Sequence, residues 1–94
     1  MGYKVRPPEL VINWLGYLFV MEQQYDKAYK MMKLNTEYYP TSWNAFDSLG
    51  EIFMIQGNTD AAIENYEKSL IINPQNANAR KMIETLKQKS EEIL

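Results

Sequence analysis

Two carboxylates four residues apart, Asp47 and Glu51, are the first candidates for chemistry in this 94-residue chain. A carboxylate pair alone is a weak indication of acid–base catalysis. Ser48 lies between them, but the sequence contains no histidine to activate it and no nucleophile elbow around it. Cysteine is also missing, and the four glycines are isolated and form no phosphate-binding loop. We therefore predict a non-catalytic chain that carries no cofactor and no metal.

Length and charge narrow the remaining classes of function. A chain of 94 residues makes one domain near the lower limit of what a single core can stabilise. The formal net charge of −2 provides no basic field, so we expect no nucleic-acid partner. The apolar run that begins at Leu10 is shorter than the roughly 20 residues that a bilayer span needs, and nothing before it reads as a targeting signal. We expect a cytoplasmic protein without a membrane partner.

The chain contains an internal repeat, whose length is the distance from Leu15 to Leu49. A shift by that length brings six pairs of identical residues together: Leu15 with Leu49, Gly16 with Gly50, Phe19 with Phe53, Asp26 with Asp60, Ala28 with Ala62, and Pro40 with Pro74. Chance supplies one or two such matches, but not a set that falls on small, aromatic and helix-breaking positions together. Such a period indicates stacked units that bury their apolar faces against one another.

Each repeat predicts two short helices, so we expect an all-α fold. In the second repeat, Thr41 or Ser42 is the expected N-cap of the first helix, and Gly57 with Asn58 ends that helix. A fifth helix is expected from about residue 77 to residue 92. The expected organisation is an N-terminal linker or arm at residues 1–8, repeat units at 9–42 and 43–76, and a C-terminal capping helix at 77–94.

This pattern resembles the tetratricopeptide repeat, which favours a large residue, Leu-Gly and an aromatic residue, then a small residue, an aromatic, another small residue and proline. The second unit matches it at Phe46, Leu49, Gly50, Phe53, Ala62, Tyr66, Ser69 and Pro74. The first unit has Ile12, Leu15, Gly16, Phe19, Ala28, Met32, Asn35 and Pro40 at the same places. Met32 and Asn35 depart from the pattern, so we expect the second helix of that unit to pack less regularly.

The resemblance implies a right-handed α-solenoid of two antiparallel helix-turn-helix units that acts as a protein–protein interaction module. The last helix has Arg80, Ile83, Glu84 and Lys87 at the corresponding positions and fails the pattern. It is expected to be the solvated end helix that such arrays need.

In this family the first helix of each unit lines the concave face, where ligands usually bind. The candidates for that groove are Asn13, Tyr17, Asn44, Asp47, Glu51 and Lys81. With so few cations among them, the groove is not expected to grip a C-terminal carboxylate. An apolar or aromatic peptide with a basic residue toward Asp47 and Glu51 fits better. For that acidic pair itself, a solvated helix face is the more ordinary interpretation.

The first predicted helix is apolar nearly all round, which is unusual for a surface helix. The interface candidates on it are Leu10, Val11, Trp14, Tyr17, Leu18 and Met21. An exposed apolar patch of this kind marks an interface. A second copy of the chain, an upstream domain or a partner peptide could cover it, and a homodimer is the leading expectation. Alternatively, residues 1–6 fold back over Val11 and Leu18, with Tyr3 and Val5 as the covering side chains.

The region from Tyr38 to Leu86 is also similar to short repeat tails at the C-termini of some bacterial serine hydrolases, namely esterase-like α/β-hydrolases and β-lactamase-family proteins. No residue of this chain carries hydrolase chemistry. The similarity implies an alternative function, in which the chain is the non-catalytic accessory tail of a larger hydrolase.

Overall fold

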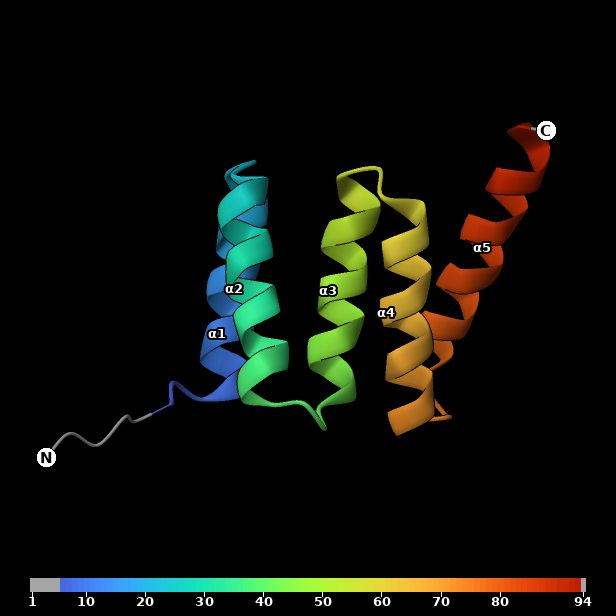
Figure 1. Ribbon diagram of the computed structural model, residues 1–94. Coiled ribbons are helices and arrows are strands. Elements are labelled where there is room, and N and C mark those ends of the chain that lie inside the picture. The colour runs from blue at the N-terminus through green and yellow to red at the C-terminus, as the bar shows by residue number, and fades with distance from the viewer. Residues whose placement is uncertain (1–5, 94) are drawn as a thin grey trace, which may run out of the picture.

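The computed structural model describes residues 6–93, with side chains described to residue 90. Within that range the chain forms α-helices and no strands (Figure 1). The helices are α1 (Glu9–Met21), α2 (Tyr25–Tyr38), α3 (Trp43–Ile55), α4 (Thr59–Ile72) and α5 (Ala77–Ile93). The expected all-α fold is confirmed. The starts of α1, α3 and α5 at Glu9, Trp43 and Ala77 are equally spaced, by the repeat length that relates Leu15 to Leu49.

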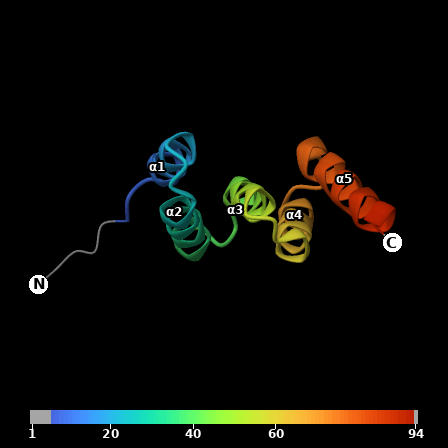
Figure 2. The same cartoon turned by 90° about the horizontal axis from the view of Figure 1, so that it is seen from above.

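Successive helices pack against each other in chain order, and α1 also touches α3. Viewed from above, α1, α3 and α5 lie on one side of the array, and α2 and α4 lie on the other (Figure 2). The array is elongated, with extents of 56 × 30 × 17 Å. We call the side formed by α1, α3 and α5 the inner face.

The helix starts differ between the two units. Ser42, Asn58 and Asn76 each accept a hydrogen bond from the backbone N–H three residues further on, at 3.2 to 3.3 Å. Ser42 is thus the N-cap of α3, as the sequence allowed. Pro8 and Gln24 precede α1 and α2 and provide no side-chain cap. Because an N-cap contributes about 1 kcal/mol, the first unit begins its helices with less local stabilisation than the second.

The departures at Met32 and Asn35 leave α2 regular, with 14 residues like α4, so the expected irregular packing does not occur along the helix itself. The Met32 side chain is buried against the position of Gly16. The departure appears instead at Asn35, which is 1% exposed and whose side-chain oxygen and nitrogen both lack a hydrogen-bond partner. An unpaired buried amide costs free energy that a small residue would not.

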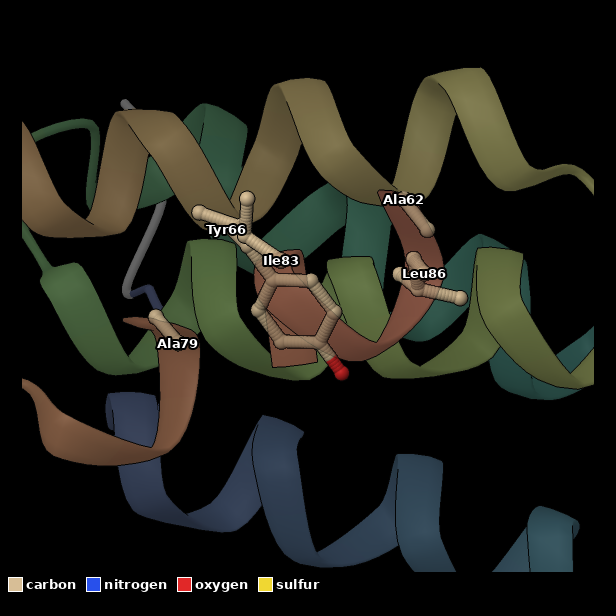
Figure 3. Packing of buried hydrophobic residues seen from close by; sticks show 5 residues of the cluster. All are labelled: Ala62, Tyr66, Ala79, Ile83 and Leu86. Atoms are coloured by element: carbon tan, nitrogen blue, oxygen red, sulfur yellow. The ribbon is translucent and has the colours of Figure 1, made fainter. Parts of the chain in front are cut away.

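Two apolar clusters hold the array together. One contains Ala28, Met32, Leu49 and Ile52 and joins the first unit to the second. The other joins the second unit to α5 and contains Ala62, Tyr66, Ala79, Ile83 and Leu86 (Figure 3). The partly buried Phe53 packs against both clusters. The core is therefore a continuous layer between neighbouring helices, as expected for stacked repeats.

Gly16 and Gly50 permit the close approach of the two helices within each unit, but against different neighbours. A Cβ at Gly16 would lie 3.1 Å from Cγ and 3.2 Å from Cε of Met32, a flexible side chain. A Cβ at Gly50 would lie 3.1 Å from three ring atoms of Tyr66. A ring held on both sides cannot bend away as a methionine can. The second unit is therefore the less tolerant of added volume.

We predict that Gly50→Ala lowers the free energy of unfolding by about 1–2 kcal/mol, after the gain in helix propensity is included. Gly16→Ala should change it by less than about 0.5 kcal/mol, because the movement of Met32 is offset by the same gain. Urea unfolding followed by circular dichroism measures both values. The opposite order of the two variants would contradict this account of the helix contacts.

The turns inside the two units share one backbone conformation with different residues. Gly57 has φ +80° and Gln23 has φ +60°. Glycine adopts this left-handed region freely, whereas a residue with a Cβ is strained there by about 1–2 kcal/mol.

Gln23→Gly is therefore expected to raise the free energy of unfolding by about 0.5–1 kcal/mol, the strain relieved less the added entropy of the unfolded glycine. Gly57→Gln, the reverse exchange, should lower it by a similar amount. A Cβ at Gly57 meets nothing within 4 Å, so backbone strain is the dominant effect. Equal effects of the same sign from both exchanges would show that the turn conformation does not control stability.

Candidate interaction surfaces

One side of α1 carries apolar side chains that the described residues leave uncovered. At about 100° per residue, the six interface candidates fall within roughly one third of the helix circumference. Leu10 is 74% exposed, Trp14 60% and Met21 79%, and Val11 is exposed as well. Tyr17 and Leu18 are half-buried. We call the surface formed by Leu10, Val11, Trp14, Leu18 and Met21 the α1 outer face.

The second unit shows what this face lacks. Ala45, Ser48 and Ile52 of α3 are the counterparts of Val11, Trp14 and Leu18, one repeat length further along the chain. All three are 2% exposed or less, and Ile52 belongs to the cluster that joins α2 to α3. The same positions of α1 have no helix of the described residues against them. Among residues 6–93, the α1 outer face is therefore a packing surface with no helix against it.

The described part of the N-terminal arm contacts the end of α2. The Arg6 guanidinium donates to the backbone oxygen of Tyr38 at 2.7 Å, and the Tyr39 hydroxyl donates to the backbone oxygen of Pro7 at 2.7 Å. Tyr3 and Val5, the residues of the alternative lid over α1, lie outside the described residues. The lid therefore stays a prediction.

The other end of the array, at α5, carries charged side chains. Arg80, Glu84 and Lys87 of α5 are exposed and are the repeat counterparts of Phe46, Gly50 and Phe53 of α3. In α3, Gly50 lies against Tyr66 of α4, and Phe53 packs against the clusters on both sides of α3. Charged side chains there make an apolar neighbour unfavourable. The two ends of the array thus present opposite surfaces.

On the inner face, a hydrogen-bonded group links α1 to α3. The Tyr17 hydroxyl donates to Oε1 of Glu51 at 2.9 Å and lies 3.3 Å from Oγ of Ser48. Glu51 is half-buried and Ser48 is 2% exposed. Tyr17 is thus part of a contact between two helices and is not a free groove residue.

Asp47 is covered by the start of α5. The Asn76 amide donates to Oδ2 of Asp47 at 2.8 Å, and the Asn78 amide lies 3.2 and 3.3 Å from the two carboxylate oxygens. Asp47 is 8% exposed. The expectation that Asp47 and Glu51 form a solvated helix face is therefore wrong for Asp47, because the loop before α5 folds over it.

The other groove candidates make no hydrogen bond to Tyr17, Asp47 or Glu51 in the described residues. Asn44 is half-buried, and Asn13 has a buried Oδ1 without a hydrogen-bond partner. Lys81 is exposed. Across residues 6–90, the ion pair that the structure contains joins Lys68 to Glu64 within α4. Tyr17, Asp47 and Glu51 therefore come together without a cation.

Sequence reasoning missed two members of the inner-face network, Asn76 and Ser69. Asn76 caps α5 and also donates at 2.8 Å to Oγ of Ser69, which in turn donates to the backbone oxygen of Trp43 at 2.8 Å. An asparagine just before a predicted helix is a recognisable N-cap signal. Ser69 gave no such signal, since it fits the repeat pattern as an ordinary packing residue.

The negative charge of the inner face contributes to raised pKa values of two tyrosines. The pKa of Tyr17 is raised to about 12, mainly by burial and also by the charges of Glu51 and Asp47, while the hydrogen bond with Ser48 lowers it. Burial also raises the pKa of Tyr66, followed by the charges of Asp47 and Glu51. Both phenols are therefore held in the neutral form well above neutral pH.

We predict that Tyr17 makes stability fall as pH rises. Its pKa is higher in the folded than in the unfolded chain, so its contribution is fully present below about pH 10 and is lost between pH 10 and 12. In urea unfolding at pH 9 to 11.5, the free energy of unfolding should therefore fall less steeply with pH for Tyr17→Phe than for the wild type. Tyr25→Phe, at the first residue of α2, controls for the removal of a phenol. Equal slopes for Tyr17→Phe and the wild type would contradict the prediction.

The described residues contain no group of three or more acidic, histidine or cysteine side chains that could hold a metal ion. None of the helices in that range combines the length and hydropathy that crossing a membrane requires.

Comparison with known proteins shows what this chain is similar to. The family model described as "TPR repeat" matches residues 50–80. A mutant of MamA has a similar structure, with a TM-score of 0.78 and 22% identity over 95% of this chain and 65% of that one. MamA MSR-1 gives a TM-score of 0.77 and 24% identity, covering 89% of this chain and 48% of that one.

The chain spans about half to two thirds of the MamA chains that it matches. No curated protein matches its sequence. The likeness to MamA shows the fold, and the family model identifies the repeat. The chain therefore folds as a helical array like those of the MamA structures, and its residues 50–80 match the model of the tetratricopeptide repeat.

Proposed function

We propose that the chain is a protein–protein interaction module that self-associates through the α1 outer face. The observation that carries this proposal is the contrast between equivalent positions of the two units. Val11, Trp14 and Leu18 occupy positions whose counterparts in α3 are buried by a neighbouring helix. A helix of another molecule against α1 would bury them in the same way.

The residue types on this face favour a protein interface. Tryptophan is enriched among the residues that contribute most to binding, and Trp14 lies between Leu10 and Leu18 on the helix surface. Full burial of a large apolar side chain contributes roughly 1.5–3 kcal/mol. Leu10, Trp14 and Met21 are each at least 60% exposed, so most of that contribution is still available to an interface.

The opposite end of the array favours a closed dimer over a chain of copies. Head-to-tail stacking would place the α1 outer face against Arg80, Glu84 and Lys87 of α5 and desolvate their charges. Pairing of α1 with α1 about a twofold axis avoids that cost and uses the same surface twice. The net charge of −2 per chain adds little repulsion.

Light scattering after size exclusion, over a tenfold range of concentration, tests this proposal. The wild type should give the mass of a dimer, and Trp14→Lys and Leu10→Lys should each shift the mass toward a monomer. Ile71→Lys is the matched control, because Ile71 is 80% exposed on α4 and lies outside the α1 outer face. Circular dichroism confirms that each variant is folded.

A folded wild-type monomer at every concentration would contradict self-association. The same face would then fit the second candidate, docking to an attached domain, for which the similarity to hydrolase tails is the basis. Loss of the dimer in Ile71→Lys as well would contradict the assignment to α1.

A further inference from the structure

The apolar residues of the α1 outer face follow a regular spacing. Steps of three, four and three residues separate Val11, Trp14, Leu18 and Met21. At about 100° per residue they form a stripe about 80° wide along α1, and Gly16 lies on the opposite side of the helix, against α2. Alternating steps of three and four are typical of helices that pack side by side at a small crossing angle. The stripe therefore fits the side of a second helix.

The sizes of these side chains distinguish two ways of pairing α1 with the same helix of a second copy. In a parallel pair each residue meets its own counterpart, so the two Trp14 side chains share one layer and the two Val11 side chains share another. In an antiparallel pair centred on the stripe, Trp14 meets the partner's Leu18, and Val11 meets the partner's Met21. Large side chains that face smaller ones fill the layers more evenly, as dense packing requires. The sizes therefore favour the antiparallel pair.

The two ends of α1 favour the same orientation. The start of α1 has no side-chain cap, so its first backbone N–H groups form the positive end of the helix dipole. Glu9 of that turn bonds to Ser42 on the side of α1 away from the stripe. Glu22, the C-cap residue, is exposed at the other end. An antiparallel pair brings Glu22 of each copy near the start of the partner's α1, whereas a parallel pair brings two Glu22 carboxylates and two negative helix ends together.

We propose that two copies pair through antiparallel α1 helices, with Trp14 against the partner's Leu18 and Glu22 beside the start of the partner's α1. This inference rests on the proposed self-association and specifies the arrangement of its interface. The partner is recognised by matched layers of side chains and by a charge at each end, which a general apolar contact would not require.

Disulfide cross-linking tests the orientation, because the sequence contains no cysteine and the introduced thiols are the only ones. The probes are Val11→Cys and Met21→Cys, one of which carries an affinity tag so that mixed and uniform dimers separate on a nonreducing gel. After mixing under reducing conditions and transfer to a glutathione redox buffer, the two variants should cross-link to each other. Each variant alone should remain largely monomeric on the gel, because positions 11 and 21 are about 15 Å apart along the helix and a disulfide cannot span that distance.

The outcomes separate the orientation from self-association. Efficient cross-linking of Val11→Cys with itself and of Met21→Cys with itself would show a parallel pair and overturn the inference. A dimer in light scattering without cross-linking of the mixture would also overturn it, while self-association would stand. A folded monomer in light scattering would contradict both. Ile71→Cys, exposed on α4, should not cross-link to Met21→Cys and controls for random collision.

Glu22→Gln provides a second test, whose sign differs between the two orientations. The amide oxygen can still accept from Gln24, which donates to Glu22 at 2.8 Å, so the turn is preserved. In the antiparallel pair the lost charge should weaken the dimer about two- to fivefold at low ionic strength, the effect of one acid at a helix N-terminus. In a parallel pair the same exchange removes repulsion and strengthens the dimer, which would overturn the inference. Glu67→Gln, exposed on α4, should leave the affinity unchanged, and an equal effect of the two variants would show that only overall charge matters and overturn the role of Glu22.

Discussion

The whole array depends on one repeated contact, in which the second helix of each unit lies against the first helix of the next. This contact buries Ile52 against α2 and Leu86 against α4. Each helix buries its apolar side chains against its neighbours. A helix at either end of the array has a neighbour on one side only, so it cannot bury its apolar side chains as a middle helix does. At α5 charged residues replace the packing residues, and the end is compatible with water. At α1 the apolar packing residues remain, and this end of the array exposes them to water.

The two units also differ in how completely they satisfy their buried polar groups. In the second unit Asp47, Ser69 and Asn76 bond to one another and to the backbone. Their counterparts one repeat length earlier are Asn13, Asn35 and Ser42. There the amide atoms of Asn35 and the oxygen of Asn13 are buried without partners. With the strained Gln23 and two uncapped helices, the first unit combines weaker local structure with the open apolar face.

Much of the architecture could be predicted from the sequence, because the repeat is carried by residues whose roles are local. Gly50 allows a close helix contact, Ser42 caps a helix and Gly57 forms a left-handed turn. Each of these roles depends mainly on the residue's own position in the chain. The exposure of α1 was predictable for the same reason, since its apolar residues could be compared with their counterparts in α3.

The inner face could not be predicted in that way. Whether Asp47 is solvated depends on Asn76, which lies 29 residues further along the chain and reaches it only after α5 has packed on α4. A repeat pattern assigns a residue to a face, but it does not say what covers that face. Tyr66 shows the same limit, since the pattern explains its ring but gives no information about its hydroxyl.

The two surfaces meet at Tyr17. Its ring belongs to the apolar side of α1, and its hydroxyl bonds to Glu51 on α3 at 2.9 Å. A molecule packed on α1 that keeps the helix in place preserves this bond. A molecule that rotates α1 breaks the bond and leaves the half-buried carboxylate of Glu51 without the hydrogen bond from Tyr17. Because a partly buried carboxylate is costly without a hydrogen-bond partner, the contact at the inner face opposes such a rotation. The bond between Tyr17 and Glu51 therefore sets how strongly occupancy of one end of the array is felt at its centre.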